Sequence, residues 1–417
     1  MAQTRSNNDP ARVAEAGGDL VRPAVERVAL VINELAPGGG ERVVAHLAGG
    51  LPARSVQTLV VCIARKGLLG DQLERDGAAV TVLGSTKGYD LGAIARLAGT
   101  LRRFSPTVIN CHDRSSMPYL VLANMLAGRR PVVYSAHGLL FNAGREPRLR
   151  HRLAMRGVSL ATAVSDQVAR RHAEYLAWSK GFTIIPNGVP DAAASDERRQ
   201  TVRRELGIDA AAFVFLAAGN ARPEKGFEDL LDAAASLAQA MPGRDVTVLI
   251  AGKMSDSPYC RDLLARQKRL GLEGTVRFLG YRGDTNALYS AADAFVLSSR
   301  SEGLPMVLLE AMTAGLPVVA TRVGGVPDAA TDSAALLVDP ACPQGLGRAM
   351  ARLAGDHDLR RRIAAAARRR ALANYGVETM ISRYLDAYSC AAEGKRRPAK
   401  PSAPAAGGED SPTGGAR

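Results

Sequence analysis

Short apolar segments of strand length alternate with longer amphipathic segments of helix length along most of this chain, and the alternation begins twice. The first series starts with VERVALVI at residues 25–32, and the second starts with AFVFLAAGN at 212–220, after a polar segment at 190–205. A strand, a helix and a parallel strand form a right-handed unit, and repeats of that unit build a doubly wound sheet with helices on both faces. The pattern therefore predicts an α/β protein with two Rossmann-like domains that face each other across a cleft.

The composition changes at both ends of the chain. Residues 1–24 are polar and rich in Ala and Gly, and residues 393–417 are rich in Pro, Gly, Ala and charge. We expect disordered tails there, because such segments bury too little apolar surface to fold. We place the N-terminal domain at 25–189 and the C-terminal domain at 190–376, with TIIPNGVP at their junction. The last helix, at 377–392, is expected to pack back across the first domain.

The chain is basic, with 54 Lys and Arg residues against 41 Asp and Glu residues and a formal net charge of +13. That excess favours anionic partners. Nucleic acid is not expected among them, because aromatic residues make up only 5% of the chain and no stacking motif interleaves the basic residues. Arg-rich segments such as 145–156, REPRLRHRLAMR, can be solvated helix faces or contacts with an anionic membrane surface or lipid-linked acceptor.

The five cysteines are scattered, and their number is odd. This pattern favours neither a disulfide framework nor a zinc site. No run of about 18 apolar residues is present, and the N-terminus lacks the hydrophobic core of a signal peptide. We therefore expect a soluble cytoplasmic protein, with peripheral contact at the inner face of a membrane left open.

The clearest site signal is the segment 298–327, in which Glu302 and Glu310 stand eight positions apart around a Gly-Leu-Pro turn. The preceding AFVLSS has strand length, the turn interrupts it, and MVLLEAMTAG follows with helical spacing. The start of such a helix presents unpaired N–H groups and a positive dipole end, which favour a diphosphate. Carboxylates accept hydrogen bonds from hydroxyl groups. The segment therefore predicts a site for a phosphorylated, polyhydroxylated ligand.

Two cations follow the first strand of the second domain. In GNARPEKGFEDLL, Arg222 and Lys225 stand between that strand and the next helix, which places them at the ligand cleft of a parallel sheet. There they can neutralise a leaving diphosphate. Solvation of an ordinary helix start is the other interpretation, since Pro223 and Glu224 are common first-turn residues.

The first domain offers a glycine-rich loop and two histidines at the corresponding edge. LAPGGGERV at 35–43 opens a helix, but its contiguous glycines do not match a dinucleotide fingerprint. The loop either lets backbone N–H groups approach a ligand or is simply a tight turn. His112 and His137 each follow a strand, where a histidine can take a hydroxyl proton, orient a sugar hydroxyl or cap a turn. Asp113 is a weaker candidate of the same kind.

One acidic triplet, Asp356-His357-Asp358, could suggest a metal-bound nucleotide. It stands directly before LRRRIAAAARRR, where acidic residues complement the dipole of a helix start, and we interpret it as an N-terminal helix signal. No other His, Cys or carboxylate cluster has metal-ligand spacing. We therefore expect neither a metal nor another cofactor.

Taken together, these motifs resemble those of the retaining glycosyltransferases of the GT-B fold, specifically glycosyltransferase family 4. The resemblance covers about residues 26–390. Its most specific element is SRSEGLPMVLLEAMTAGLPVVAT followed by GGVP, which matches the family's two glutamates separated by seven residues. Further matches, in the family's order, are PGGGER, YSAHG, TAVS, IPNGV, RPEKG and LYSAADAFVLSS.

The resemblance implies transfer of a sugar from a nucleotide diphosphate sugar, held by the second domain, to an acceptor held by the first, with retention at the anomeric carbon. By this resemblance, Glu302 contacts hydroxyls of the donor sugar, Glu310 contacts the nucleotide ribose and Lys225 binds the diphosphate. The family's arginine usually stands five positions before that lysine, where this chain has Asn220. Arg222 would therefore fill the arginine's role from a different position.

The resemblance also assigns backbone groups and a mechanism. The diphosphate or the sugar would be held by the N–H groups of Gly303, Leu304, Met306 and Val307. Gly39 and Gly40 match the loop near the donor phosphates and acceptor, and His137 matches the histidine near the reacting centre. Family members are thought to use a front-face substitution, in which the leaving phosphate helps to deprotonate the acceptor.

No motif names the acceptor, and we expect a lipid-linked or polysaccharide glycan of the cell envelope or of an exopolysaccharide. Two alternatives stay open. One is a nucleotide-sugar epimerase or a phosphorylase of the same fold, and the other is a noncatalytic carbohydrate-binding protein. The presence of Glu302, Glu310 and Lys225 together argues against the noncatalytic alternative.

Overall fold

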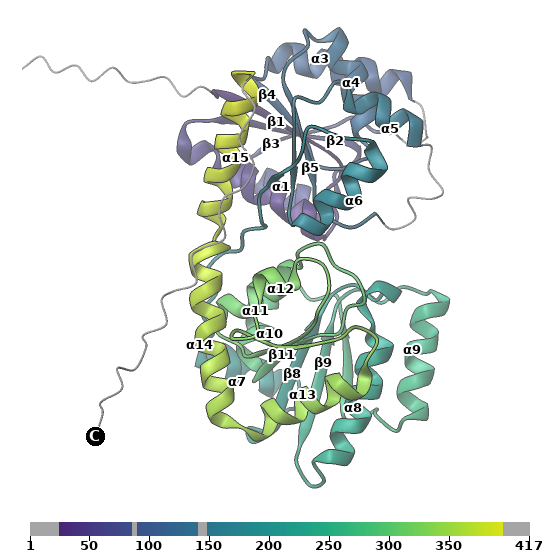
Figure 1. Cartoon of the computed structure of the whole chain (residues 1–417), viewed down its shortest axis with the longest axis vertical. Coiled ribbons are helices and arrows are strands. Elements are labelled where there is room, and N and C mark those ends of the chain that lie inside the picture. Colours follow the sequence, from purple (N-terminus) through teal and green to yellow (C-terminus); the bar gives the residue numbers. More distant parts are fainter. Residues whose placement is uncertain (1–24, 86–89, 141–147, 395–417) are drawn as a thin grey trace, which may run out of the picture.

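The computed structural model describes residues 25–85, 90–140 and 148–394. The N-terminal tail, nearly all of the predicted C-terminal tail and the first residues of the basic segment at 145–156 therefore lie outside the described residues. Within the described part, two parallel sheets with flanking helices lie one above the other along the long axis of the molecule (Figure 1). The predicted architecture of two doubly wound α/β domains is confirmed.

The first sheet has seven parallel strands in the order β3-β2-β1-β4-β5-β6-β7. Its order reverses between β1 and β4, and the carboxyl ends of the strands at such a switch point open into a crevice. β4 and β5 are buried along their full length, as a sheet with helices on both faces requires. The strands are β1 (Arg27–Glu34), β2 (Gln57–Arg65), β3 (Ala79–Val82), β4 (Val108–Cys111), β5 (Val132–Ala136), β6 (Leu160–Ala163) and β7 (Thr183–Ile184).

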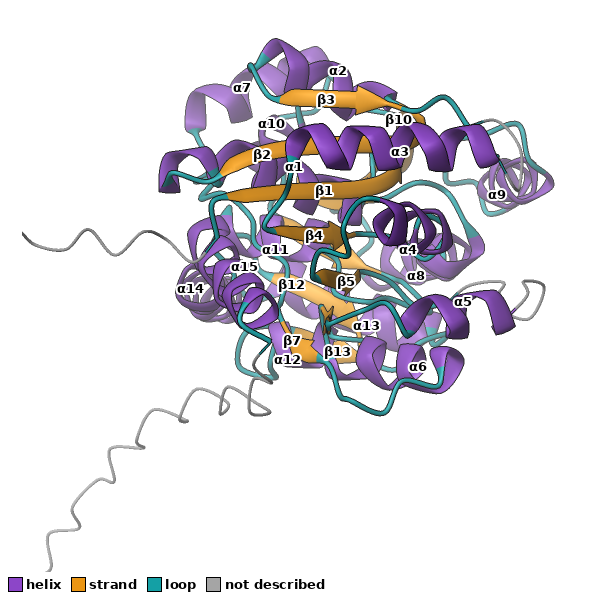
Figure 2. Ribbon diagram, turned by 90° about the horizontal axis from the view of Figure 1, so that it is seen from above, coloured by secondary structure: helices purple, strands orange, loops and turns teal. Residues whose placement is uncertain are grey.

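Helices cover both faces of the first sheet (Figure 2). One layer consists of four helices that pack side by side in chain order: α3 (Leu91–Phe104), α4 (Met117–Leu126), α5 (Arg148–Met155) and α6 (Asp166–Leu176). In the other layer the first helix packs between its successor and the last helix of the chain: α1 (Gly39–Gly50), α2 (Gly67–Arg75) and α15 (Val377–Ala392). A short 3-10 helix, η1 (Pro52–Arg54), follows α1.

The second sheet has six parallel strands in the order β10-β9-β8-β11-β12-β13, with its switch point between β8 and β11. Its strands are β8 (Phe213–Ala218), β9 (Val246–Ala251), β10 (Val276–Gly280), β11 (Ala294–Leu297), β12 (Val318–Thr321) and β13 (Leu336–Val338). The longer helices of this domain are α7 (Asp196–Glu205), α8 (Phe227–Ala240), α9 (Pro258–Arg269), α13 (Pro343–Gly355) and α14 (His357–Asn374). The shorter ones are η3 (Pro223–Lys225), α10 (Thr285–Ala291), α11 (Met306–Thr313) and α12 (Val326–Ala329).

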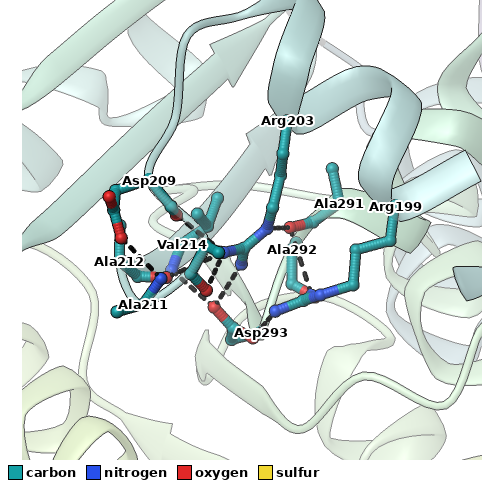
Figure 3. A network of polar contacts seen from close by, with 10 residues as sticks. Arg199, Arg203, Asp209, Ala211, Ala212, Val214, Ala291, Ala292 and Asp293 are labelled. Atoms are coloured by element: carbon teal, nitrogen blue, oxygen red, sulfur yellow. Dashed lines mark hydrogen bonds and ion pairs between the residues drawn. The ribbon is translucent and has the colours of Figure 1, made fainter.

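The polar segment at 190–205 contains a helix that the sequence pattern did not reveal. In α7, Arg203 is only 5% exposed and donates to the carbonyl oxygens of Ala291 and Ala212 as well as to Asp293 (Figure 3). Asp293 also accepts from Arg199 and from the backbone N–H of Val214. This network ties the starts of β8 and β11 together, at the end of the sheet opposite the cleft. Arg199 and Arg203 of this segment are therefore structural, whereas Arg198 and Arg204 are exposed.

The chain returns to the first domain through α14 and α15. Asp356 caps α14, because its carboxylate accepts from the N–H of Leu359 at 2.9 Å, as the interpretation of the acidic triplet required. α15 then packs on α1, β4 and β5. Asn110 on β4 donates a hydrogen bond of 2.7 Å to the buried hydroxyl of Tyr388. The C-terminal helix is thus part of the first domain's core and links the two domains.

Candidate active site

The carboxyl ends of the two sheets meet at the turn between β11 and α11. A Cβ atom on Gly303 in this turn would stand 2.7 Å from the carbonyl oxygen of His137 in the first domain, so only glycine fits there. Ser165 donates a hydrogen bond to the Gly303 carbonyl (3.3 Å), and Asn187 donates one to the Leu304 carbonyl (2.8 Å). The turn that the sequence singles out therefore lies where the domains touch.

Glu302 is held in this turn by one cation and one hydroxyl group. Its Oε1 atom accepts hydrogen bonds from Lys225 Nζ and from Ser299 Oγ, each at 2.6 Å. The side chain of Glu302 is only 10% exposed, and a carboxylate that is buried to this degree requires such partners. Within the described residues, Oε2 makes no hydrogen bond, so it can accept one from a ligand hydroxyl group.

Glu310 lies just over one turn into α11 and is contacted from both domains. Tyr289 donates a hydrogen bond of 2.9 Å to its Oε2 atom, and Arg42 on α1 forms an ion pair with its Oε1 atom. Burial, together with the neighbouring Glu310 carboxylate, raises the pKa of Tyr289 well above its ordinary value, so the phenol remains a donor. Both carboxylate oxygens are therefore engaged, and a ligand hydroxyl that binds Glu310 Oε1 would have to displace Arg42.

The two predicted cations differ in their surroundings. Lys225 ends η3, and its ammonium is committed to Glu302. Arg222 immediately precedes η3 and is exposed, with the Glu41 carboxylate of the first domain as a charged neighbour. Lys225 thus belongs to a preformed ion pair, whereas Arg222 stands at the edge of the site.

Two helix N-termini face the same point between the domains. α11 begins at Met306, and the N–H groups of Met306 and Val307 belong to its first turn, where no intrahelical acceptor exists. α1 begins at Gly39, where an added Cβ would lie 3.9 Å from Met306 Cγ. On Gly40 an added Cβ would lie 3.1 Å from the ring of His137. Two converging positive helix ends suit a diphosphate.

His112 and His137 form a stacked pair at the ends of β4 and β5. His112 Nδ1 lies 2.9 Å from His137 Nε2, the ring centroids are 5.1 Å apart and the ring planes differ by 9°. One ring must donate and the other accept along that contact. The other two ring nitrogens, His112 Nε2 and His137 Nδ1, are buried without a hydrogen-bond partner in the described part of the chain.

These histidines are neutral near pH 7. Burial lowers the pKa of His137 to about 4 and holds the pKa of His112 well below its ordinary value. Burial also lowers the pKa of His172 on α6 to about 4, and His172 accepts from the Tyr134 hydroxyl and donates to the Gly138 carbonyl, both at 3.0 Å. Because so weak a base takes up a hydroxyl proton poorly at neutral pH, the site favours orientation of a hydroxyl by His137 over general-base catalysis.

Asp113 has a structural role. Its carboxylate accepts hydrogen bonds from the backbone N–H groups of Asn33 (2.6 Å) and Ser116 (2.8 Å) and from the Ser116 hydroxyl (2.7 Å). These bonds tie the end of β1 to the loop that leads into α4. The weaker of the sequence candidates therefore caps a turn instead of facing a ligand.

A polar cavity of about 330 Å³ lies between the domains beside the β11–α11 turn. The first domain contributes Leu139, Gln167 and Arg170, and the second contributes Arg300, Ser301, Arg322, Val323 and Gly324. Gln167 Oε1 is buried without a hydrogen-bond partner among the described residues. The cavity can therefore receive a hydroxylated part of a substrate next to Glu302.

The described ranges contain neither a metal-binding cluster nor a helix that could span a membrane. No group of three or more His, Cys, Asp or Glu side chains there is arranged to hold a metal ion. Likewise, no described helix combines the length and the apolar character needed to cross a bilayer.

Four residues that shape the site were not singled out in the sequence: Arg42, His172, Tyr289 and Ser299. Arg42 carried one usable signal, because a cation in the first turn of a helix opposes the dipole and needs a nearby anion. Tyr289 lies in LYSAADAF before a buried strand, where a tyrosine needs an acceptor for its hydroxyl. His172 has no comparable signal, since its partners Tyr134 and Gly138 lie outside its own helix, whereas Ser299 bonds to Glu302 three positions further along the same turn.

Sequence comparisons place both halves of the chain among enzymes that transfer sugars. Residues 37–193 match the model of Glycosyltransferase Family 4, and residues 198–370 match that of Glycosyl transferases group 1. The chain is 28% identical over 352 residues to the lipopolysaccharide core biosynthesis glycosyltransferase LpsE of Rhizobium meliloti, covering 84% of this chain and 95% of that one. It is 25% identical over 308 residues to the N-acetyl-alpha-D-glucosaminyl L-malate synthase of Bacillus anthracis, covering 72% and 79%.

A further relative matches over a shorter stretch. The D-inositol 3-phosphate glycosyltransferase of Corynebacterium urealyticum is 36% identical over 201 residues, and the match spans about half of each chain, 46% of this one and 47% of that one. Among solved structures, Anabaena HepE in complex with UDP and glucose superposes with a TM-score of 0.78 at 26% identity, covering 87% of this chain and 99% of that one. WaaG, a glycosyltransferase involved in lipopolysaccharide biosynthesis, shares the fold with a TM-score of 0.66 at 20% identity, covering 87% and 99%.

Proposed function

Because the chain belongs to the group 1 glycosyltransferases of family 4 and has the GT-B fold, we propose that it moves a sugar from a nucleotide diphosphate sugar to a glycan acceptor with retention at the anomeric carbon. One observation supports this proposal more than any other. The Lys225–Glu302 pair lies beside two converging helix N-termini, at Gly39 and Met306, in the contact between the domains. That combination fits a sugar attached to a diphosphate.

The donor occupies the second domain in this proposal. Oε2 of Glu302 accepts a hydroxyl of the sugar, and the N–H groups of Gly303, Leu304, Met306 and Val307 are the nearby backbone donors for the diphosphate or the sugar. Glu310 holds the ribose diol after Arg42 moves away. The complexes of HepE with UDP, glucose and UDP-glucose make uridine nucleotides the first donors to test.

Departure of the nucleoside diphosphate concentrates negative charge at the helix ends. Lys225 and the two helix N-termini oppose that charge, and Arg222 can turn towards it from the edge of the site. His137 is neutral and orients a hydroxyl group, so it does not supply the base. A front-face substitution, in which the leaving phosphate takes the acceptor's proton, agrees with this set of residues.

The acceptor in this proposal is a lipid-linked or polysaccharide glycan of the cell envelope. LpsE supports this choice because its match covers 95% of that protein, a lipopolysaccharide core biosynthesis glycosyltransferase. Such an acceptor would bring the enzyme to the inner face of a membrane, as a peripheral protein. The first domain, with its neutral histidines, would hold the acceptor hydroxyl.

The proposal is tested by incubating the purified protein with UDP-glucose and other nucleotide sugars, with and without extracted lipid-linked glycans. We expect release of nucleoside diphosphate to depend on the acceptor, and the product to keep the anomeric configuration of the donor in its NMR spectrum. Interconversion of the sugar without acceptor would instead support an epimerase, and inversion at the anomeric carbon would contradict the proposed mechanism.

A further inference from the structure

The polar cavity between the domains is lined by three arginines and, within the described residues, by no carboxylate. Arg170 on α6 comes from the first domain, whereas Arg300 and Arg322 follow β11 and β12 of the second. Guanidinium groups around one space repel each other, and their planar forks match the oxygens of a carboxylate or a phosphate. We call this space the arginine cavity. Its lining favours an anionic group over a neutral one.

The arginine cavity adjoins Glu302 and differs from the place that suits a diphosphate. Ser301, which precedes Glu302, lines it, and a Cβ atom on the lining residue Gly324 would collide with the carbonyl oxygen of Glu302. The two converging helix N-termini begin at Gly39 and Met306, and neither residue belongs to the lining. An anion in the arginine cavity is therefore separate from the diphosphate and next to the residue proposed to contact the donor sugar.

Arg300 and Arg322 are held by carboxylates that lie outside the lining. Arg300 donates two hydrogen bonds of 2.8 Å to Asp229 and forms an ion pair of 2.6 Å with Glu228. A guanidinium has five N–H donors, and these contacts use three of them, which leaves two. In the described part of the chain, the Arg322 side chain contacts one acid, the exposed Asp332, at 3.0 Å. Both arginines therefore keep N–H donors for a ligand.

The two lining residues from α6 have polar groups without partners. Arg170 is exposed, and the described residues provide neither an ion pair nor a hydrogen bond for its guanidinium. Asp328 on α12 is a charged neighbour of Arg170, but the two side chains form no ion pair within the described ranges. Gln167 Oε1 is buried and accepts no hydrogen bond there. Arg170 can therefore donate to an anion, while Gln167 can accept from a hydroxyl group beside it.

Two arginine sites elsewhere in the second domain show what a structural network looks like. Arg203 donates to Asp293 and to backbone carbonyls, and Arg266 donates from Nε and from a terminal nitrogen to both carboxylate oxygens of Asp232. In each of these sites a carboxylate of the protein faces the guanidinium. In the arginine cavity the acids hold two of the arginines from outside, and the space that the three arginines line is left to a ligand.

From this arrangement we propose that the arginine cavity binds an anionic substituent, a carboxylate or a phosphate, on one of the two sugars that meet at Glu302. The inference rests on the proposed function and adds a substrate class to it, a sugar acid or a sugar phosphate. Arg170 and Arg322 donate to the anion from the two domains, and Gln167 accepts from a neighbouring hydroxyl group of the same sugar. The anion can belong to the donor sugar or to the acceptor, and binding experiments separate these two sources.

The donor source is tested by calorimetric titration of matched nucleotide sugars. The pairs are UDP-glucose with UDP-glucuronic acid, and GDP-mannose with GDP-mannuronic acid. If the donor carries the anion, the acidic member of a pair should bind at least about fivefold more tightly than the neutral member, because charge-assisted hydrogen bonds are added. This preference should shrink as the salt concentration rises.

The acceptor source is tested with free sugars, namely glucose, glucuronic acid and glucose 6-phosphate. Each is titrated with and without a bound nucleoside diphosphate. If the acceptor carries the anion, an acidic sugar should bind at least about fivefold more tightly than glucose, while the paired nucleotide sugars should show no preference. Because part of this experiment uses no nucleotide, it tests the arginine cavity even if the chain binds no nucleotide.

Two variants assign the preference to the arginine cavity. Arg170→Gln and Arg322→Gln should each weaken binding of the preferred acidic ligand by at least about threefold and binding of its neutral counterpart by less than about twofold. The matched control is Arg269→Gln, an exposed arginine on α9, which should change neither. All three variants should bind a nucleoside diphosphate like the unchanged protein, which shows that they fold.

The outcomes separate this inference from the proposed function. Equal binding of acidic and neutral sugars in both experiments would overturn the inference, and so would a preference that persists when Arg170→Gln and Arg322→Gln are combined. The proposed function would fail on a different result, namely that no nucleoside diphosphate and no nucleotide sugar binds. A preference for acidic sugars that the two substitutions abolish, with nucleotide binding unchanged, is the result that we expect.

Discussion

The two sides of the cleft are built from different chemistry. On the second domain, Glu302 and Glu310 are buried carboxylates that are already paired, the one with Lys225 and the other with Arg42. On the first domain, the side chains at the ends of β4 and β5 are imidazoles whose buried nitrogens are neutral at pH 7. The charged groups around Glu302 and Glu310 suit a charged donor, and the neutral imidazoles of His112 and His137 suit an acceptor that offers hydroxyl groups.

This difference suggests separate tasks for the two domains. The charged groups of the second domain would bind the donor, and the histidines of the first domain would orient a hydroxyl group. The Lys225–Glu302 ion pair of the second domain is preformed, whereas the Glu310–Arg42 pair has to open before Glu310 can bind a ligand. His112 and His137 share one hydrogen bond, and each has a second ring nitrogen without a partner among the described residues, so these neutral rings offer hydrogen bonds but no charge. We therefore expect substitutions on the two sides to affect different kinetic constants.

The largest effect is expected at Lys225. Lys225→Ala removes the cation that neutralises Glu302 and that we propose opposes the charge of the leaving diphosphate, so kcat/KM should fall by between about one hundred and one thousandfold. Steady-state kinetics measure the change, with the donor and acceptor that the nucleotide-sugar assay identifies. Lys268→Ala on α9 is the control and should keep full activity. If kcat/KM of Lys225→Ala fell by less than about tenfold, Lys225 would not take part in the reaction.

The second effect concerns stability at acidic pH. The folded-state pKa values of His137 and His172, about 4, lie below the unfolded value near 6.5, so the unfolded chain binds more protons between these pH values. The free energy of unfolding should therefore fall as the pH drops from 6.5 to 4, by on the order of 2 kcal/mol for each histidine.

Urea unfolding at a series of pH values tests this expectation. His172→Gln should flatten the pH dependence, whereas His357→Gln should not, because the side chain of His357 is 70% exposed. If the free energy of unfolding of the unchanged protein stayed constant over this pH range, the pKa values of His137 and His172 would not be lowered as we describe.

The third effect is on donor affinity. Glu310→Ala removes the acceptor for the ribose diol and leaves Arg42 without its ion-pair partner, so binding of a nucleotide sugar should weaken by about tenfold. Tyr289→Phe removes only one hydrogen bond to Glu310 and should weaken binding less. Calorimetric titration measures both, and unchanged affinity in Glu310→Ala would refute the ribose assignment.

The smallest effect is expected at Arg42. This guanidinium occupies the Glu310 oxygen that the ribose would use, so Arg42→Ala should strengthen nucleotide binding by about two- to threefold, and Arg42→Lys should change it less. Titration of the free nucleoside diphosphate isolates this effect from the sugar. Weaker binding in Arg42→Ala would mean that Arg42 contacts the nucleotide directly.

Local patterns predicted the fold and the positions of Glu302 and Lys225 at one edge of the second sheet. The alternation of strands and helices specifies two doubly wound sheets, and the Gly-Leu-Pro turn brings Glu302 to the start of α11. Lys225 could be placed at the same edge because it follows the first strand of its sheet. These relations depend on neighbours in sequence and on the common edge of a parallel sheet.

Contacts between residues of different helices and strands could not be predicted from the sequence. The pairing of Arg42 with Glu310 spans 268 positions, and the stacking of His112 on His137 depends on how β4 and β5 end. The helix α7 was missed because its only buried polar anchor, Arg203, resembles a solvated arginine in the sequence.

The central claim is that the charged groups of the second domain, Lys225 among them, bind the donor. The neutral histidines of the first domain contribute only after the donor is bound. Calorimetric titration of a nucleotide sugar into Lys225→Ala and into His137→Asn tests it most directly. The claim predicts at least about tenfold weaker binding in Lys225→Ala, because a hydrogen bond to a charged group is lost, and binding within about threefold of the unchanged protein in His137→Asn. Equal losses in the two variants would contradict it.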